Sequence, residues 1–162
     1  IHSSAASDVY KRQVEDSLLR KFVEAQDNYN LTESELDVGN KMFFSPVEGN
    51  LTAKFNFEEK HYGIDVSVPS GSPIRSVLDG RVLFSEWSFE TGYVLVVMHN
   101  DNLISVYKHS KKNLKSQNEF VKAGEVIAYS GNQGQLSTGP HLHFELWQNG
   151  IPINPEPFFK FN

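Results

Sequence analysis

Residues 93–109, YVLVVMHNDNLISVYKH, contain two apolar runs joined by a short polar segment. The runs at 93–99 and 103–109 are rich in Val, Ile, Leu and Tyr, which favour strands. Between them, Asn100, Asp101 and Asn102 are residue types that favour tight turns. This stretch therefore predicts two antiparallel strands joined by a hairpin turn.

Elsewhere in the sequence, apolar residues recur with a period of two. In LTAKFNF (51–57) and IDVSV (64–68), apolar residues alternate with polar ones, as expected for strands with one face on a core. Further strands are predicted at 74–78, 81–85, 125–130 and 141–147. Because the strands are closely spaced and no helical pattern separates them, they favour a mainly β fold, an antiparallel β-sandwich or partly open barrel.

The first 43 residues follow a different pattern. Residues 1–13 are small and polar, and we interpret them as a non-native or disordered tail. Residues 14–43 predict a short N-terminal helical segment and a linker, because five apolar residues recur at helical spacing: Val14, Leu18, Phe22, Ala25 and Tyr29. The β domain is then predicted at 44–162. Since the chain begins with Ile and shows no leader, we interpret it as a piece of a longer protein.

The composition excludes several classes of protein. The 162 residues carry a formal net charge of −5, whereas nucleic-acid-binding proteins present a basic face, so we expect no nucleic acid partner. The absence of cysteine excludes thiolate metal sites, cysteine nucleophiles and disulfides. The longest purely apolar run, residues 93–98, is far shorter than the roughly 20 residues that span a bilayer, so no transmembrane segment is expected here. Any metal must be bound by His, Asp or Glu.

Five side chains are candidates for metal chemistry: His61, Asp65, His109, His141 and His143. On a strand, residues two or four apart share a face, so HYGID (61–65) turns its His and Asp the same way, and HLHFEL (141–146) places its two His side by side. A catalytic zinc site takes three ligands of these types and keeps a fourth position for water. Two imidazoles are then left to handle protons and developing charge during hydrolysis. Spacing alone does not assign which two.

Residues 44–162 closely resemble the LytM/lysostaphin-type zinc metallopeptidases, which hydrolyse peptide bonds in bacterial peptidoglycan. The resemblance rests on three motifs in the same order and spacing: HYGID at 61–65, SVYKH at 105–109 and GNQGQLSTGPHLHFEL at 131–146. It implies one Zn²⁺ ion bound by His61, Asp65 and His143, with a water as the fourth ligand. It also implies that His109 and His141 activate this water and stabilise the tetrahedral intermediate. The family fold is an antiparallel β-sandwich with a groove between loops.

The resemblance predicts a zinc-dependent endopeptidase that cleaves cross-link or stem peptides of peptidoglycan. An alternative is a non-catalytic envelope module that binds peptidoglycan or activates a partner cell-wall amidase, because some relatives have lost zinc ligands and regulate other hydrolases. A third hypothesis is a zinc enzyme with a non-wall peptide substrate, since the residues specify metal-assisted hydrolysis better than the bond that is cut. We expect a periplasmic or exported location, with an envelope protein as a candidate partner of the N-terminal helix.

Three further features lie close to these motifs in the sequence. Glu145 is a candidate either for accepting the second N–H of a metal-bound imidazole or for an ordinary ion pair on a strand face. His99 ends a predicted strand at a turn and is expected to be a solvated histidine outside the site. Four basic residues are expected to lie in a solvated loop: Lys108, Lys111, Lys112 and Lys115.

Overall fold

The computed structural model describes residues 41–132 and 139–161, and within them every strand pairs antiparallel with its neighbours. The strands are β1 (Asn50–Ala53), β2 (Ile64–Ser67), β3 (Pro73–Arg75), β4 (Gly80–Ser88), β5 (Gly92–Met98), β6 (Leu103–Asn113), β7 (Phe120–Val121), β8 (Val126–Ser130), β9 (His141–Gln148) and β10 (Ile151–Ile153). A short 3-10 helix follows at Glu156–Phe158. The predicted tail at 1–13 and the predicted helix within 14–43 lie outside the described residues.

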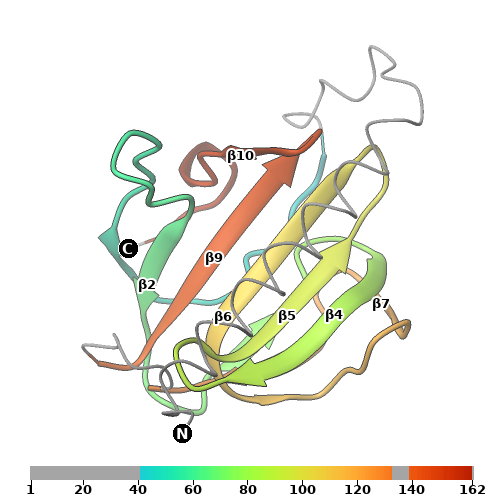
Figure 1. Cartoon of the computed structure of the whole chain (residues 1–162), viewed down its shortest axis with the longest axis horizontal. Helices are drawn as coiled ribbons and strands as arrows, with labels where there is room; N and C mark the ends of the chain where they lie inside the picture. Colours follow the sequence, from blue (N-terminus) through green and yellow to red (C-terminus); the bar gives the residue numbers. More distant parts are fainter. Residues whose placement is uncertain (1–40, 133–138, 162) are drawn as a thin grey trace, which may run out of the picture.

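The main sheet is open and has the strand order β1-β2-β9-β6-β5-β4-β7. Figure 1 shows β2, β9, β6, β5 and β4 lying side by side, with β10 at the far end of β9. The mainly β, antiparallel and partly open fold predicted from the sequence is therefore confirmed. The hairpin at 93–109 forms as β5 and β6, which pair over most of their length.

Several predicted strands differ in extent from those observed. The alternating stretch at 51–57 continues as a strand only to Ala53, and the strand predicted at 74–78 is limited to β3. In contrast, β6 runs four residues beyond His109, to Asn113. Two short strands, β7 and β10, were not predicted, because two or three residues are too few to show a period.

Strand β6 pairs with two different partners along its length. Its first part, Leu103 to Lys108, pairs with β9, whereas its last part, from Ser110, pairs with β8, which in turn pairs with β3. The main core therefore contains side chains from the main sheet, such as Ile64 and Phe144, and from the β3–β8 pair, such as Ile74 and Ile127. The change of partner falls at His109.

The opposite face of the sheet carries a second, smaller apolar cluster. It consists of Val94, Val96, Ile104 and Val106, with Leu83, Phe84 and Trp147 packed against it. Strand β5 shows the division clearly, since Leu95 and Val97 belong to the main core and alternate with residues of the second cluster. Strand β9 follows the same rule: its Leu142, Phe144 and Leu146 enter the main core.

His99 is buried, so the prediction of a solvated turn histidine is wrong. Its Nδ1–H donates to the Asp79 carbonyl at 2.8 Å, and its Nε2 lies 2.7 Å from Ser105 Oγ. Ser105 Oγ lies 3.0 Å from the Tyr107 hydroxyl, which accepts the backbone N–H of Val77 at 3.1 Å. Burial lowers the pKa of His99 to about 4, so the ring is neutral near pH 7.

No helix among the described residues has the length and apolar character needed to cross a membrane.

Candidate metal centre

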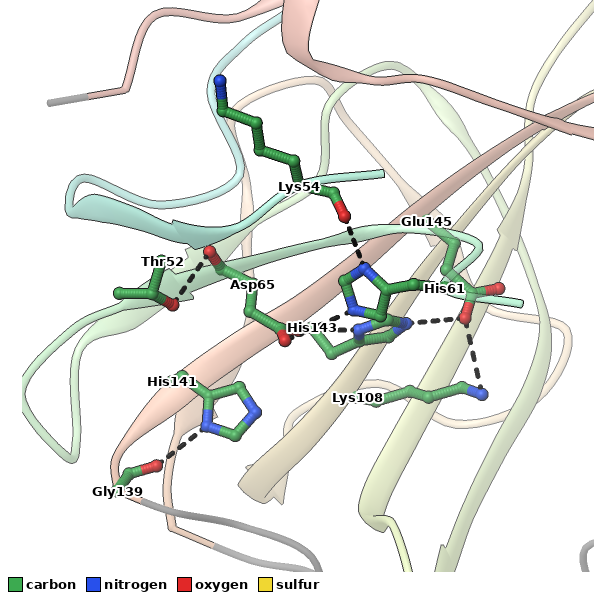
Figure 2. A network of polar contacts seen from close by, with 9 residues as sticks. All are labelled: Thr52, Lys54, His61, Asp65, Lys108, Gly139, His141, His143 and Glu145. Carbon is green, nitrogen blue, oxygen red and sulfur yellow. Dashed lines mark hydrogen bonds and ion pairs between the residues drawn. The ribbon is translucent and has the colours of Figure 1, made fainter. Parts of the chain in front are cut away.

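The centre of the candidate site is a register match across neighbouring strands. Asp65 on β2 lies directly opposite His143 on β9, and His143 lies directly opposite Lys108 on β6. Paired residues point to the same face of a sheet, and this face is the one opposite the main core. Figure 2 shows the resulting network, in which His143 Nδ1 lies 2.7 Å from Asp65 Oδ1.

His61 approaches Asp65 from a loop. The prediction placed His61 and Asp65 on one strand, but β2 begins at Ile64 and His61 belongs to an isolated bridge with Asn56. Gly63 makes this path feasible, because a Cβ at that position would clash with the backbone of Phe144. The two side chains still converge, with His61 Nε2 3.3 Å from Asp65 Oδ2. The His61 Nδ1–H donates to the Lys54 carbonyl at 2.7 Å, which leaves Nε2 facing Asp65.

Within the described residues, His61, Asp65 and His143 form one group suited to hold a metal ion, with ligand atoms within 4.8 Å of one another. The pair His143 Nδ1 and Asp65 Oδ1 supports this assignment. His143 Nε2 already faces the Glu145 carboxylate at 2.7 Å, so a neutral ring with its proton there would present a lone pair to Asp65. The 2.7 Å separation is that of a hydrogen bond, and a cation bound by both atoms would take the place of its proton. Two imidazoles and one carboxylate are the donor set that zinc takes in catalytic sites.

The same contacts shift the pKa values of His143 and Asp65. Burial alone would lower the pKa of His143, but its hydrogen bonds to Asp65 and Glu145 raise it above its usual value. Burial would raise the pKa of Asp65, yet the hydrogen bond and charge of His143 hold it below its usual range.

His109 and His141 lie beside this group. Their ring centroids are 4.7 Å apart, and the His109 ring is 6.1 Å from that of His143. His141 Nδ1–H donates to the Gly139 carbonyl at 2.8 Å, so in the neutral ring Nε2 carries the free lone pair. All five residues singled out in the sequence thus lie together, although the division of roles among them remains a prediction.

A β-bulge directs the backbone at His109. The register between β5 and β6 shifts between Tyr93 and Leu95, opposite the segment that contains His109. His109 has a φ of 69°, in the left-handed region that is uncommon for residues other than glycine, and its N–H donates to the Thr91 carbonyl at 2.9 Å. The bulge marks the end of pairing with β9 and the start of pairing with β8.

Glu145 takes part in both kinds of interaction considered for it. Oε2 accepts the His143 Nε2–H and lies 3.6 Å from Lys108 Nζ, while Oε1 accepts the Trp147 indole N–H at 2.8 Å. Burial would raise the pKa of Glu145, but Lys108 and these two hydrogen bonds hold it well below its usual range. The solvated-loop prediction is wrong for Lys108, Lys111 and Lys112, which lie on β6.

The group suited to hold a metal ion lies at one face of a mainly β domain. The chain matches the model of Peptidase family M23 over residues 59–155, more than half of its length, and belongs to that family. The structure of lysostaphin from Staphylococcus simulans, described as an antimicrobial peptidase, superposes with a TM-score of 0.61 at 26% identity, covering 71% of this chain and 53% of lysostaphin. The resemblance stated from the motifs is confirmed.

Three further relatives show the range of functions in proteins similar to this chain. A zinc-containing peptidase from Vibrio cholerae superposes with a TM-score of 0.66 at 32% identity, covering 70% of this chain and 39% of that one. The peptidoglycan DD-endopeptidase ShyC of V. cholerae is 36% identical over 110 residues, and the murein hydrolase activator NlpD of Escherichia coli is 35% identical over 112. Each alignment covers 68% of this chain, but only 24% of ShyC and 29% of NlpD. The chain therefore spans roughly a quarter of these curated relatives.

Proposed function

We propose that this protein is a zinc-dependent endopeptidase that hydrolyses peptide bonds in the cross-link or stem peptides of bacterial peptidoglycan. One observation carries the proposal: His61, Asp65 and His143 present ligand atoms within 4.8 Å of one another, and two further imidazoles lie directly beside them. The similarity to a peptidoglycan endopeptidase and to lysostaphin supports the choice of substrate. Such a substrate requires a periplasmic or exported location.

The three ligands would be His61 through Nε2, Asp65 through its carboxylate and His143 through Nδ1. A bound zinc ion supplies a Lewis acid that polarises the scissile carbonyl and lowers the pKa of water. The protein contributes orientation, since the Lys54 carbonyl fixes the His61 ring through its other nitrogen. Fixed rings lose little freedom on metal binding, which favours a single ligand geometry.

Hydrolysis of an amide needs a group that accepts a proton from the attacking water and later supplies one to the departing amine. We assign this role to His141, because the Gly139 carbonyl holds its proton on Nδ1 and leaves Nε2 able to accept. His109, whose ring lies 4.7 Å from that of His141, then donates a hydrogen bond to the oxygen that becomes negative as the carbonyl carbon turns tetrahedral.

Purified peptidoglycan sacculi digested with and without a chelator would test the proposal. We expect cleavage that chelation abolishes and added zinc restores, and mass spectrometry of the released fragments would identify the bond. His143→Ala should remain inactive when zinc is added, because one of three ligands is missing. The exposed Lys112→Ala on β6 is the matched control and should cleave like the unaltered protein. Cleavage by the chelated protein at an undiminished rate would contradict a metal-dependent mechanism.

A second candidate function is activation of a partner cell-wall amidase, and the similarity to the activator NlpD favours it. An activator would bind sacculi and raise the turnover of an added amidase, while releasing no fragments by itself. Its effect should also survive in His143→Ala. Cleavage of soluble non-wall peptides with intact sacculi would instead support a zinc enzyme with a different substrate.

A further inference from the structure

We propose that Glu145 is a positioning residue that holds the proton of His143 on Nε2 and so presents Nδ1 to the metal. This inference rests on the proposed function in one respect, since it takes His143 as a ligand. It adds a residue whose carboxylate touches no substrate and acts only through the imidazole beside it.

The strand geometry aligns the two side chains. His143, Glu145 and Trp147 are alternate residues of β9, so they share the face that carries the candidate metal centre. Glu145 Oε2 accepts from His143 Nε2 at 2.7 Å, and Oε1 accepts from the Trp147 indole at 2.8 Å. Both carboxylate oxygens are therefore engaged, and the carboxyl group has a defined orientation. Figure 2 shows the contact of Glu145 with His143.

The surroundings of Glu145 keep this contact from being exchanged for water. Its side chain is only 8% exposed. Val106 lies directly opposite it on β6, and Ile104 lies opposite Trp147, both within the second apolar cluster. A carboxylate in such a place is costly unless its oxygens are hydrogen-bonded and its charge is balanced. Lys108 Nζ lies 3.6 Å from Glu145 Oε2, close enough to balance its charge but too far for a hydrogen bond. The short contact of Oε2 is therefore the one with His143.

The position of the hydrogen between Glu145 and His143 determines which nitrogen of His143 can bind a metal ion. An ionised carboxylate only accepts, so the hydrogen between Glu145 and His143 belongs to Nε2. In a neutral ring with its hydrogen on Nε2, the lone pair lies on Nδ1, the atom that faces Asp65. The other two rings follow the same plan through backbone oxygens, His61 through the Lys54 carbonyl and His141 through the Gly139 carbonyl. Glu145 does for His143 what those carbonyls do for the other two rings. Its negative charge also makes His143 a stronger electron-pair donor to a metal ion.

The test is Glu145→Gln, measured as zinc affinity in competition with a chromophoric chelator. The amide has one acceptor oxygen and no charge, so it cannot serve both His143 and Trp147, and we expect zinc to bind about 10- to 100-fold more weakly. Glu86→Gln, an exposed position on β4, is the matched control and should bind zinc like the unaltered protein. Trp147→Phe keeps the carboxylate but removes one hydrogen bond, so its loss of affinity should be smaller.

A spectroscopic signature separates positioning from a merely structural role. In the zinc-loaded protein, ¹⁵N NMR of the histidine rings should show His143 protonated on Nε2 and not on Nδ1. Glu145→Gln should weaken the hydrogen bond at Nε2 and shift that resonance, with the melting temperature as a separate measure of folding. If Glu145→Gln does not fold, the measurement on the unaltered protein still tests whether Nδ1 is the nitrogen presented to zinc, and Trp147→Phe then tests the role of the carboxylate.

The outcomes distinguish this inference from the proposed function. Equal zinc affinity in Glu145→Gln and the unaltered protein, or a proton on Nδ1 of zinc-loaded His143, would overturn the role of Glu145 while leaving the endopeptidase proposal in place. Zinc binding that depends on Glu145, without cleavage of sacculi, would support the inference and contradict the endopeptidase.

Discussion

His99 differs from the histidines of the candidate site in how its nitrogens are used. Both of its nitrogens face groups inside the protein, Asp79 and Ser105, so neither is available to a ligand. In contrast, His61 and His141 each donate one N–H to a backbone carbonyl and keep the other nitrogen toward the site. Whether a histidine of this protein can bind a ligand therefore depends on whether one of its ring nitrogens is directed toward the site. For His99 the Asp79 carbonyl lies 20 residues away in the sequence, whereas for His141 the Gly139 carbonyl lies within the same motif.

The buried His99 predicts a loss of stability in mild acid. Its pKa is about 4 in the folded protein and near 6.5 when unfolded, so the unfolded state binds the extra proton as pH falls from about 6.5 to 4. Stability is therefore intact above pH 6.5 and declines below it, by about 2 kcal/mol at pH 5 from this residue alone. Urea unfolding at pH 7.5 and pH 5 measures the change.

Other groups also titrate over this range, so the comparison needs a variant. His99→Gln removes the titrating ring and should be less stable at pH 7.5, because a hydrogen bond is lost. Its further loss between pH 7.5 and pH 5 should be smaller than that of the unaltered protein. Equal losses in the two proteins would contradict the assignment to His99.

At the scale of elements, the bulge in β6 falls at His109, which also belongs to the candidate site. His109 adopts a φ of 69° where the strand leaves β9 and joins β8. A β-branched residue in this conformation is strained, whereas Asn adopts it readily. The conformation and the imidazole can therefore be tested apart.

We expect His109→Asn to fold with nearly unchanged stability and to lose cleavage of sacculi. His109→Val should lose activity and, in addition, about 1–3 kcal/mol of stability, because valine at positive φ is an outlier. Urea midpoints and fragment release are the two measurements. Equal stability of the Asn and Val variants would show that the backbone at this position relaxes without cost.

The strands were predictable where a long run of strand-favouring residues borders a turn, as in β5 and β6, or where apolar and polar residues alternate, as in β9. The prediction was less accurate where tertiary contacts end an alternating pattern, as after Ala53, or where a strand consists of two residues, as in β7. The candidate site was predictable as a set of residues because its motifs are dense. Of its supporting contacts, the Glu145 acceptor was among the candidates, but the pairing of Lys108 with Glu145 depends on how β6 and β9 meet, and the Lys54 carbonyl on the path of the loop before β2.

At the scale of the whole molecule, the candidate metal centre joins a loop to two strands. His61 precedes β2, Asp65 lies on β2 and His143 lies on β9, so an ion bound to all three would link segments that unfolding separates. Zinc at about 100 times its dissociation constant should stabilise the fold by about 2.7 kcal/mol. For a chain of this length we expect a melting temperature higher by roughly 5–10 °C.

Differential scanning calorimetry with zinc or with chelator measures this shift. His143→Ala should show little or no shift with zinc, and magnesium should have little effect on either protein because it prefers oxygen ligands. An equal rise in His143→Ala would place the stabilising zinc elsewhere on the protein.

The direct register of Asp65 against His143 has a consequence for how the site assembles. Sliding β9 by one residue would turn His143 inward and expose Phe144, and the burial of Ile64, Val66, Leu142 and Phe144 opposes that slip. Apolar packing on one face of the sheet therefore fixes which side chains lie next to each other on the opposite face. Because these apolar contacts do not involve the ligand atoms, we expect the domain to stay folded when a bound ion is removed, unlike a zinc finger, whose chain needs its ion in order to fold.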